Sequence, residues 1–196
     1  MDKRYQKTEE KLSQSLITLL NDYSLYEISI TKLCRYANVQ RNTFYDHYDN
    51  IYDLLEHIVS SYEFDALKII SSTASDKNFN GMITNTINTI YLDKNLQKLL
   101  KIPSFSNAYL LRISNKCNKL VTKSFPIKPN IDKDKYICAN RYATGGTILL
   151  IYDWINSGLK ESPTSIIQKI VEFAQNTLEV YLKWYLYFYY CVKIVL

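Results

Sequence analysis

Glycine and proline are scarce in this chain of 196 residues. Four of each occur, about a third of the usual share, and none lies before Gly81. Sandwiches, barrels and collagen need many of these residues at turns or in repeats, so the shortage argues against all three. With 47% hydrophobic and 22% charged residues, the chain is also too apolar to be disordered. We therefore expect an all-α fold of long helices in one or two domains.

Cysteine and histidine are also few. The four cysteines lie far apart with no C-x-x-C pair, and only two histidines, His47 and His57, are present. Because no metal-ligand spacing occurs, we predict no metal site and no cofactor. Four buried thiols in a reducing cytoplasm are the simplest interpretation. The first residues lack the apolar run of a signal peptide, which favours a cytoplasmic location.

Catalytic motifs are missing too. The sequence has no G-x-S-x-G, Walker A, G-x-G-x-x-G or H-E-x-x-H pattern, so we predict no catalytic residue and no enzyme. Residues 184–192 are nine apolar residues, six of them aromatic, bounded by Lys183 and Lys193. This run is too short to span a membrane. Two interpretations of this run remain: an aromatic seam between the subunits of a dimer, and a contact with a membrane interface.

Hydrophobic periodicity predicts helices along most of the chain. The expected ranges are 8–22, 30–37, 41–48, about 50–72, 81–92, a shorter one ending near residue 101, 106–123, about 134–158 and about 163–190. Ser29, Asn50 and Ser162 suit N-caps, and Pro163 suits a first helical position. Gly145 and Gly146 fall inside a helix and predict close packing between helices.

The last predicted helix has an unusually wide apolar face. Two adjacent rows run along it at alternating spacings of four and three. One row is Ile166, Ile170, Phe173, Thr177, Val180, Trp184, Tyr187 and Cys191, and the other is Ile167, Val171, Ala174, Leu178, Tyr181, Tyr185, Phe188 and Val192. One row can serve the protomer's own core and the other a second subunit. Burial on several sides within one chain is the alternative.

Residues 29–48 carry the most specific pattern. Two short helices, 30–37 and 41–48, are joined by a tight turn, with apolar residues at 30, 33, 37, 39 and 44. Packed on the first helix, such a pair forms a helix-turn-helix, whose second helix can enter the major groove of DNA. The turn requires a residue at positive φ, and Asn38 is the best choice other than glycine.

At this point the sequence resembles the TetR family of transcriptional regulators. Residues 37–48, Ala-Asn-Val-Gln-Arg-Asn-Thr-Phe-Tyr-Asp-His-Tyr, match the family pattern A-G-V-S-x-x-T-[LF]-Y-x-H-F. The match extends over residues 8–60, and residues 142–163 look like the penultimate helix and its exit in one branch of the family. The resemblance implies an all-helical homodimer, an N-terminal DNA-reading domain and a C-terminal domain for dimerisation and a ligand or partner.

The resemblance and the helix-turn-helix geometry together predict the DNA-contacting residues. Arg41 can pair with guanine, and Gln40 or Asn42 with adenine. Tyr48 either reaches a phosphate or packs beneath the helix as the family's Phe does. His47 matches a position that contacts the DNA backbone, with a solvated helical histidine as the alternative. The predicted set is Thr31, Lys32, Gln40, Arg41, Asn42, Thr43, Tyr45, His47 and Tyr48.

The N-terminal region has a net negative charge, which is not what DNA binding suggests. Residues 1–60 hold seven basic and nine acidic side chains, although the whole chain is +5. Ile51 stands where the family often has a lysine that meets a phosphate, and Asp46, Asp49 and Asp53 lie close to the expected DNA face. We therefore expect modest affinity with a strong dependence on salt, or a dimer that needs a cooperating partner.

Positive charge is concentrated instead in residues 94–141, which hold eleven Lys and Arg. Four of them, Arg112, Lys116, Lys119 and Lys123, share one helix face. A solvated face is the simpler interpretation, and a docking surface for an acidic protein or ligand is the alternative.

These observations predict a homodimeric, sequence-specific DNA-binding transcriptional regulator, a repressor rather than an activator, controlled by an effector. Residues 1–60 form its helix-turn-helix domain and residues 61–196 its helical dimerisation and effector domain. The expected partners are double-stranded DNA, a second copy through the last two helices (about 134–190), and a small-molecule or protein effector. Two alternatives stay open: a regulator or activator controlled by a protein docked on the basic C-terminal half, and a helical binding module without DNA.

Overall fold

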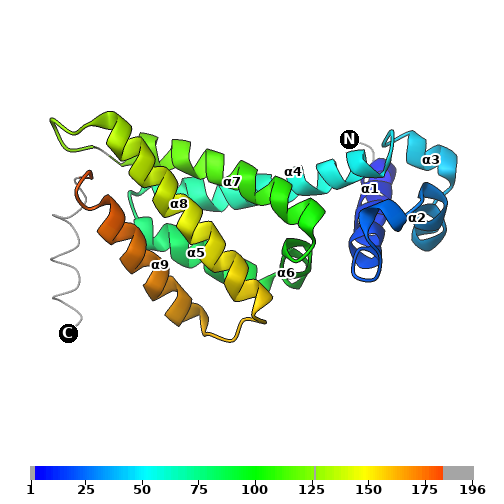
Figure 1. Cartoon of the computed structure of the whole chain (residues 1–196). Coiled ribbons are helices and arrows are strands. Elements are labelled where there is room, and N and C mark those ends of the chain that lie inside the picture. Colours follow the sequence, from blue (N-terminus) through cyan, green and yellow to red (C-terminus); the bar gives the residue numbers. More distant parts are fainter. Residues whose placement is uncertain (1–2, 126, 183–196) are drawn as a thin grey trace. The chain divides into compact units, whose positions relative to one another are not determined.

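The structure is a computed structural model that describes residues 3–125 and 127–182 (Figure 1). Its helices are α1 (Lys3–Leu19), η1 (Leu25–Glu27), α2 (Ile30–Ala37), α3 (Arg41–Tyr45), α4 (Ile51–Ser75), α5 (Phe79–Leu92), α6 (Lys94–Leu100), α7 (Pro103–Ser124), α8 (Lys133–Asn156) and α9 (Pro163–Leu178). No strand forms in the described ranges, where Ile127 and Leu182 make an isolated bridge. The predicted all-α class is confirmed. None of the helices described is long and apolar enough to cross a membrane.

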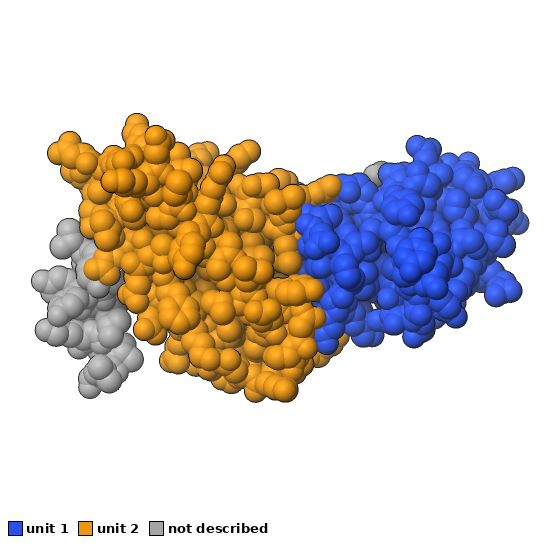
Figure 2. Space-filling model, viewed as in Figure 1, with its two compact units in different colours: residues 1–64, 95–109 blue, residues 65–94, 110–196 orange. Residues whose placement is uncertain are grey.

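The chain divides into two compact units, which Figure 2 colours separately. Residues 1–64 and 95–109 make up the first unit, and residues 65–94 and 110–196 the second. The division predicted from sequence, after residue 60, follows function rather than compactness. It stays a prediction.

In the first unit, α2 packs against α1, and α3 packs against α2 (Figure 1). The side chains at their common centre are apolar and spaced as the helical period requires. They are Leu12, Leu16, Leu33, Ala37, Phe44 and Leu54, each at most 8% exposed. This shared core holds the short α3 at the surface of the unit.

Local capping explains where most helices begin. The Ser29 side chain accepts a hydrogen bond from the Lys32 backbone N–H (3.2 Å), and Asn50 Oδ1 accepts one from Asp53 N–H (3.0 Å). Ser162 caps α9 in the same way, with Pro163 in the first turn. These predicted caps are confirmed, because each side chain satisfies an N–H that the helix leaves without a partner.

Several predicted boundaries were wrong. The recognition helix ends at Tyr45 rather than at residue 48, and α7 begins at Pro103 rather than at residue 106. Proline lacks a backbone N–H, so it fits the first helical position, where that N–H would have no intrahelical partner.

The last helix was predicted to reach residue 190, but α9 ends at Leu178. The chain turns there because the segment after α7 binds the backbone carbonyls of the residues that follow Leu178. Lys128 Nζ donates to the Glu179 carbonyl (2.7 Å), and Lys128 N–H donates to the Tyr181 carbonyl (2.9 Å). The remaining residues of the two apolar rows, from 184 onward, lie outside the described residues.

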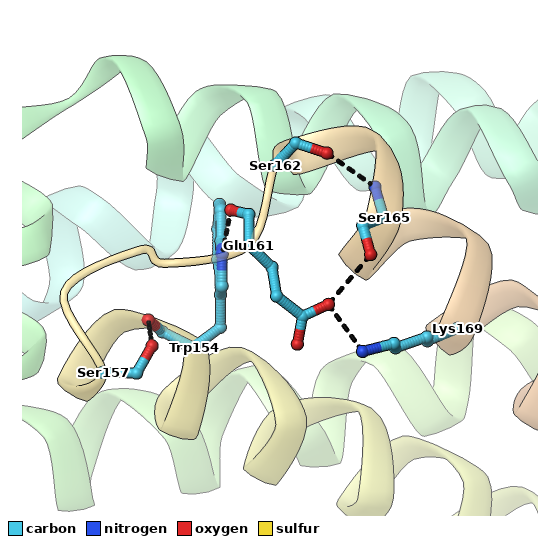
Figure 3. Close-up of polar contacts among 6 residues, drawn as sticks. All are labelled: Trp154, Ser157, Glu161, Ser162, Ser165 and Lys169. Atoms are coloured by element: carbon cyan, nitrogen blue, oxygen red, sulfur yellow. Dashed lines mark hydrogen bonds and ion pairs between the residues drawn. The ribbon is translucent and has the colours of Figure 1, made fainter.

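The connection from α8 to α9 is held by polar contacts around one carboxylate (Figure 3). Glu161 Oε2 accepts hydrogen bonds from Lys169 Nζ (2.6 Å) and Ser165 Oγ (2.9 Å). Its backbone carbonyl accepts one from Trp154 Nε1 (2.9 Å). These contacts tie the loop to both helices, and Lys169 with Ser165 holds the pKa of Glu161 below its ordinary value.

Gly145 and Gly146 do not pack closely against another helix, so that prediction was wrong. A Cβ built at either position would meet no atom within 4 Å. Both glycines line an open groove of about 590 Å³ between α8 and α9. The reason is that their face of α8 is directed away from the core of this chain.

The cysteines also differ from expectation. Cys34 is buried and Cys117 is half-buried, but Cys138 is exposed, and Cys191 lies outside the described residues. Burial raises the pKa of the Cys117 thiol to about 12, so this group stays neutral at physiological pH. Because Cys138 faces solvent on α8, the prediction of four buried thiols was wrong.

Candidate nucleic-acid interface

The segment from α2 to α3 forms the sharp turn that the sequence predicts. Asn38 has φ 51° and ψ 50°, which is the left-handed conformation. The turn is closed by the Val39 N–H, which donates to the Cys34 carbonyl (3.0 Å). Since Leu33 and Phe44 on either side of the turn are fully buried, the relative orientation of α2 and α3 is set by the core of the unit.

The start of α3 faces solvent. Gln40, Arg41, Asn42 and Tyr45 are exposed, and Thr43 is half-buried. The Arg41 guanidinium donates to the Tyr45 hydroxyl over 3.4 Å, one helical turn away. This pair gives the outward face of α3 five guanidinium N–H donors beside a phenol, which is the chemistry that reads guanine edges and phosphates.

The first turn of α2 adds two more of the predicted residues. Thr31 is exposed and Lys32 is half-buried. The Lys32 ammonium lies over the Tyr23 ring, with Nζ 2.8 Å from the ring centre. Tyr23, which the sequence reasoning missed, thus places the lysine charge at the N-terminal end of α2 by a cation–π contact.

His47 is neither solvated nor directed outward. Its side chain is 3% exposed and stacks on Tyr5, with ring centres 3.8 Å apart. Its Nδ1 lies 4.0 Å from a Glu9 carboxylate oxygen. The solvated alternative was therefore wrong, because the first turns of α1 cover this ring. No pattern in the sequence links positions 5 and 9 to position 47.

Tyr48 packs beneath the reading element. It is 5% exposed, with its ring centre 5.9 Å from that of Phe44 and 5.5 Å from that of His57. Burial raises the pKa of its phenol, and the nearby Glu9 charge adds to the effect. A phosphate contact would require the ring to leave the core, so of the two predicted roles the packing role is the one that the structure supports.

One acidic residue near the expected DNA face, Asp53, has a structural role. Asp53 accepts a hydrogen bond from the Asp49 N–H (3.2 Å) while its own N–H donates to Asn50. This reciprocal cap stabilises the start of α4. Ile51, which replaces the lysine expected from the family, is buried and contributes to the core.

The second unit contains a separate interior cavity of about 80 Å³. It lies between α4, α5, α7, α8 and α9, and its wall is mostly aliphatic. Four large aromatic side chains, Phe105, Tyr109, Tyr136 and Trp154, are buried in the chain, but none of them lines this cavity. No three His, Cys, Asp or Glu side chains converge on a possible metal position within the described residues.

The basic face predicted on α7 is present as a helix surface. Lys116, Lys119 and Lys123 are exposed, and Arg112 is half-buried. Its docking role stays a prediction.

An all-helical chain with an N-terminal helix-turn-helix defines a class of transcriptional regulators, and comparison with known proteins identifies the family. A family model for the C-terminal region of TetR transcriptional regulators matches residues 77–176. The chain therefore belongs to the TetR family, as the pattern of residues 37–48 suggested. No curated protein matches the sequence significantly.

Solved structures of regulators share the fold over nearly their whole length. NalD, the secondary repressor of a multidrug efflux pump in Pseudomonas aeruginosa, is 14% identical with a TM-score of 0.64, covering 93% of this chain and 99% of its own. A TetR regulator from Streptococcus agalactiae is 20% identical with a TM-score of 0.66, covering 88% and 96%. The dihydroxyacetone kinase operon activator DhaS is 18% identical with a TM-score of 0.62, covering 90% and 98%.

Proposed function

We propose that this protein is a homodimeric, sequence-specific DNA-binding regulator of transcription whose affinity for its operator is set by an effector. The observation that carries the proposal is the exposed Arg41–Tyr45 pair at the start of α3, presented by a left-handed turn at Asn38. Membership of the TetR family supports the same function.

In the proposed complex α3 enters the major groove. Arg41 donates to guanine O6 and N7, while Gln40 and Asn42 are placed to read adenine. Tyr45, Thr31 and Lys32 bind phosphates and set the register of the helix. Consecutive major grooves on one side of DNA lie about 34 Å apart, so the two reading heads of a dimer would contact half-sites one helical turn apart.

The open face of α8 and α9 supports the proposed dimer. Tyr142, Leu149 and Phe173 are 76%, 63% and 55% exposed around the groove that Gly145 and Gly146 line. Large apolar side chains gathered on one face of a chain mark an interaction surface. The glycines leave room for the backbone or side chains of a second copy to approach closely.

We propose that the protein represses transcription rather than activating it. NalD is named as a repressor, and DhaS as an activator, so this fold supports both outcomes. A dimer bound across its own promoter blocks polymerase by occupancy alone, which needs no further surface on the protein.

The DNA-reading proposal is tested by replacing Arg41 and Tyr45 with alanine and measuring binding to the gene's own promoter DNA in a mobility-shift assay. Loss of a bidentate arginine contact costs about 1–3 kcal/mol, so specific affinity should fall roughly 5- to 150-fold per half-site. The matched control replaces Lys11 and Tyr26, which are exposed in the same unit but away from α3. Equal specific binding by the wild type and the Arg41/Tyr45 variant would rule out the assignment.

The dimer is tested with Phe173→Glu. A charge in the middle of the proposed interface should convert a dimer into a monomer at micromolar concentration, as measured by sedimentation velocity. Phe64→Glu is the control, because Phe64 is 70% exposed and belongs to the other unit. A Phe173→Glu protein that stays dimeric would place the interface elsewhere.

A further inference from the structure

The interior cavity of the second unit has no charged wall. Its lining is dominated by aliphatic and aromatic side chains such as Ile70, Phe79 and Ile151. Of the described residues that line it, none is Asp, Glu, Lys, Arg or His, and the Cys117 thiol is neutral. A charged ligand would lose its hydration there without gaining a counter-ion, so the cavity excludes ions.

One buried polar side chain in this wall is incompletely satisfied. Asn140 is 2% exposed, and its Nδ2 donates to the Asn118 carbonyl (3.2 Å) and to Thr122 Oγ1 (3.4 Å). A carbonyl oxygen can only accept, so the atom facing it must be the amide nitrogen, and the orientation of the Asn140 amide is determined. Both amide hydrogens are used on α7. The Oδ1 atom of Asn140 accepts no hydrogen bond from any described residue.

Two of the three threonine hydroxyls in the cavity wall donate their hydrogens within the unit. Thr144 Oγ1 donates to Asn118 Oδ1 (3.0 Å), and Thr86 Oγ1 donates to the Met82 carbonyl (2.8 Å). Both threonines line the cavity. Thr147, the third threonine of the wall, has a hydroxyl that can either donate or accept, whereas Asn140 Oδ1 can only accept and therefore complements a ligand that brings a donor of its own.

We infer that this cavity is the effector site and that it takes a small, neutral molecule with one hydroxyl or N–H group, which donates to Asn140 Oδ1. The inference rests on the effector control proposed above. A cavity of 150 Å³ holds benzene, so one of about 80 Å³ accommodates roughly three to five non-hydrogen atoms. Short-chain alcohols have this size and this chemistry.

Four probes of equal size and branching test the ligand class. Propan-2-ol carries a donor, acetone only an acceptor, and acetate and isopropylammonium carry charges of opposite sign. The full-length chain, labelled in its isoleucine methyl groups, is titrated with each probe and followed by NMR, since Ile83, Ile113 and Ile151 line the cavity. We expect saturable shifts of these methyls with propan-2-ol at a dissociation constant about two- to tenfold below that of acetone, and no saturable shift with either ion.

Two variants connect the preference to the site. Asn140→Leu should reduce the preference for propan-2-ol over acetone to less than about twofold, because it removes the acceptor. Cys117→Leu keeps Asn140 but fills the cavity, and it should abolish binding of both neutral probes even if Asn140→Leu disturbs the packing of α7. The matched control is Asn156→Leu, which makes the same change at an exposed position of α8.

Equal binding of acetone and propan-2-ol, a preference that persists in Asn140→Leu, saturable binding of an ion, or no binding by any probe would each overturn the inference. A mobility-shift titration with and without propan-2-ol separates it from the DNA-reading proposal. If promoter affinity is the same with and without bound propan-2-ol, the cavity is not the effector site. If the wild type binds no promoter DNA, the DNA proposal is refuted and the NMR result still stands.

Discussion

Asn38 allows a quantitative test of how a chain without an early glycine forms the turn of its helix-turn-helix. The residue holds φ 51° and ψ 50°, and its side chain is exposed. Substitutions there act on the backbone and not on the core. A left-handed conformation costs an ordinary L-residue about 1–2 kcal/mol, and a β-branched residue is the least tolerant.

We therefore expect a graded series in the free energy of unfolding. Asn38→Gly should remain within about 0.5 kcal/mol of wild type, because glycine relieves the strain of the left-handed turn but adds entropy to the unfolded chain. Asn38→Ala should lower it by about 1 kcal/mol, and Asn38→Val by about 2 kcal/mol. Promoter affinity should fall in the same order, since α3 depends on this turn for its orientation.

The assay is urea unfolding at one fixed protomer concentration, because dimerisation would otherwise shift the midpoint. Asn42→Val is the control, since Asn42 is exposed within α3 and Asn and Val have similar helix propensities. If Asn38→Val unfolds at the wild-type midpoint, or if Asn38→Gly loses as much as Asn38→Val, the turn is not under the strain that we assign to it.

Three further outcomes are expected. Gly81→Ala should lower the free energy of unfolding by about 1–2 kcal/mol in a urea melt, because a Cβ would lie 2.5 Å from the asparagine amide that caps α5. A maleimide should label Cys138 well before Cys117, as peptide mass spectrometry would show, since Cys138 alone is exposed among the three cysteines that the structure describes. The pKa of Glu161 is lowered in the folded chain by Lys169, so the ionised carboxylate stabilises the fold at pH values above its unfolded pKa. This stabilisation is lost as the pH falls through the folded pKa. The urea midpoints of wild type and Glu161→Gln should therefore converge in acid.

Features that depend on nearest neighbours were predictable. Ser29, Asn38, Asn50 and Ser162 were assigned as caps or as a turn, and each has that role in the structure. In all four cases the deciding contact lies within one helical turn along the chain. The side chain and the backbone group that it satisfies are therefore both visible in a short stretch of sequence.

Contacts between distant segments were not predictable in the same way. The burial of His47 by Tyr5 and Glu9 depends on how α1 crosses the segment after α3. The vacant acceptor on Asn140 depends on the register of α8 against α7, which places two acceptors opposite its amide nitrogen. Periodicity assigns a residue to a face of its helix but does not say which residue of another helix meets it.

By itself the sequence determined that this protein is all-helical, that residues 29–48 form a helix-turn-helix, and that Asn38 must replace the missing glycine in its turn. Only the tertiary structure decided that α9 stops at Leu178, that Cys138 is exposed, and that Gly145 and Gly146 line an open groove. Caps and backbone preferences act over about four residues, so the sequence contains them in full. Burial and helix termination by a distant loop arise only when the helices have packed, because they depend on which surfaces meet.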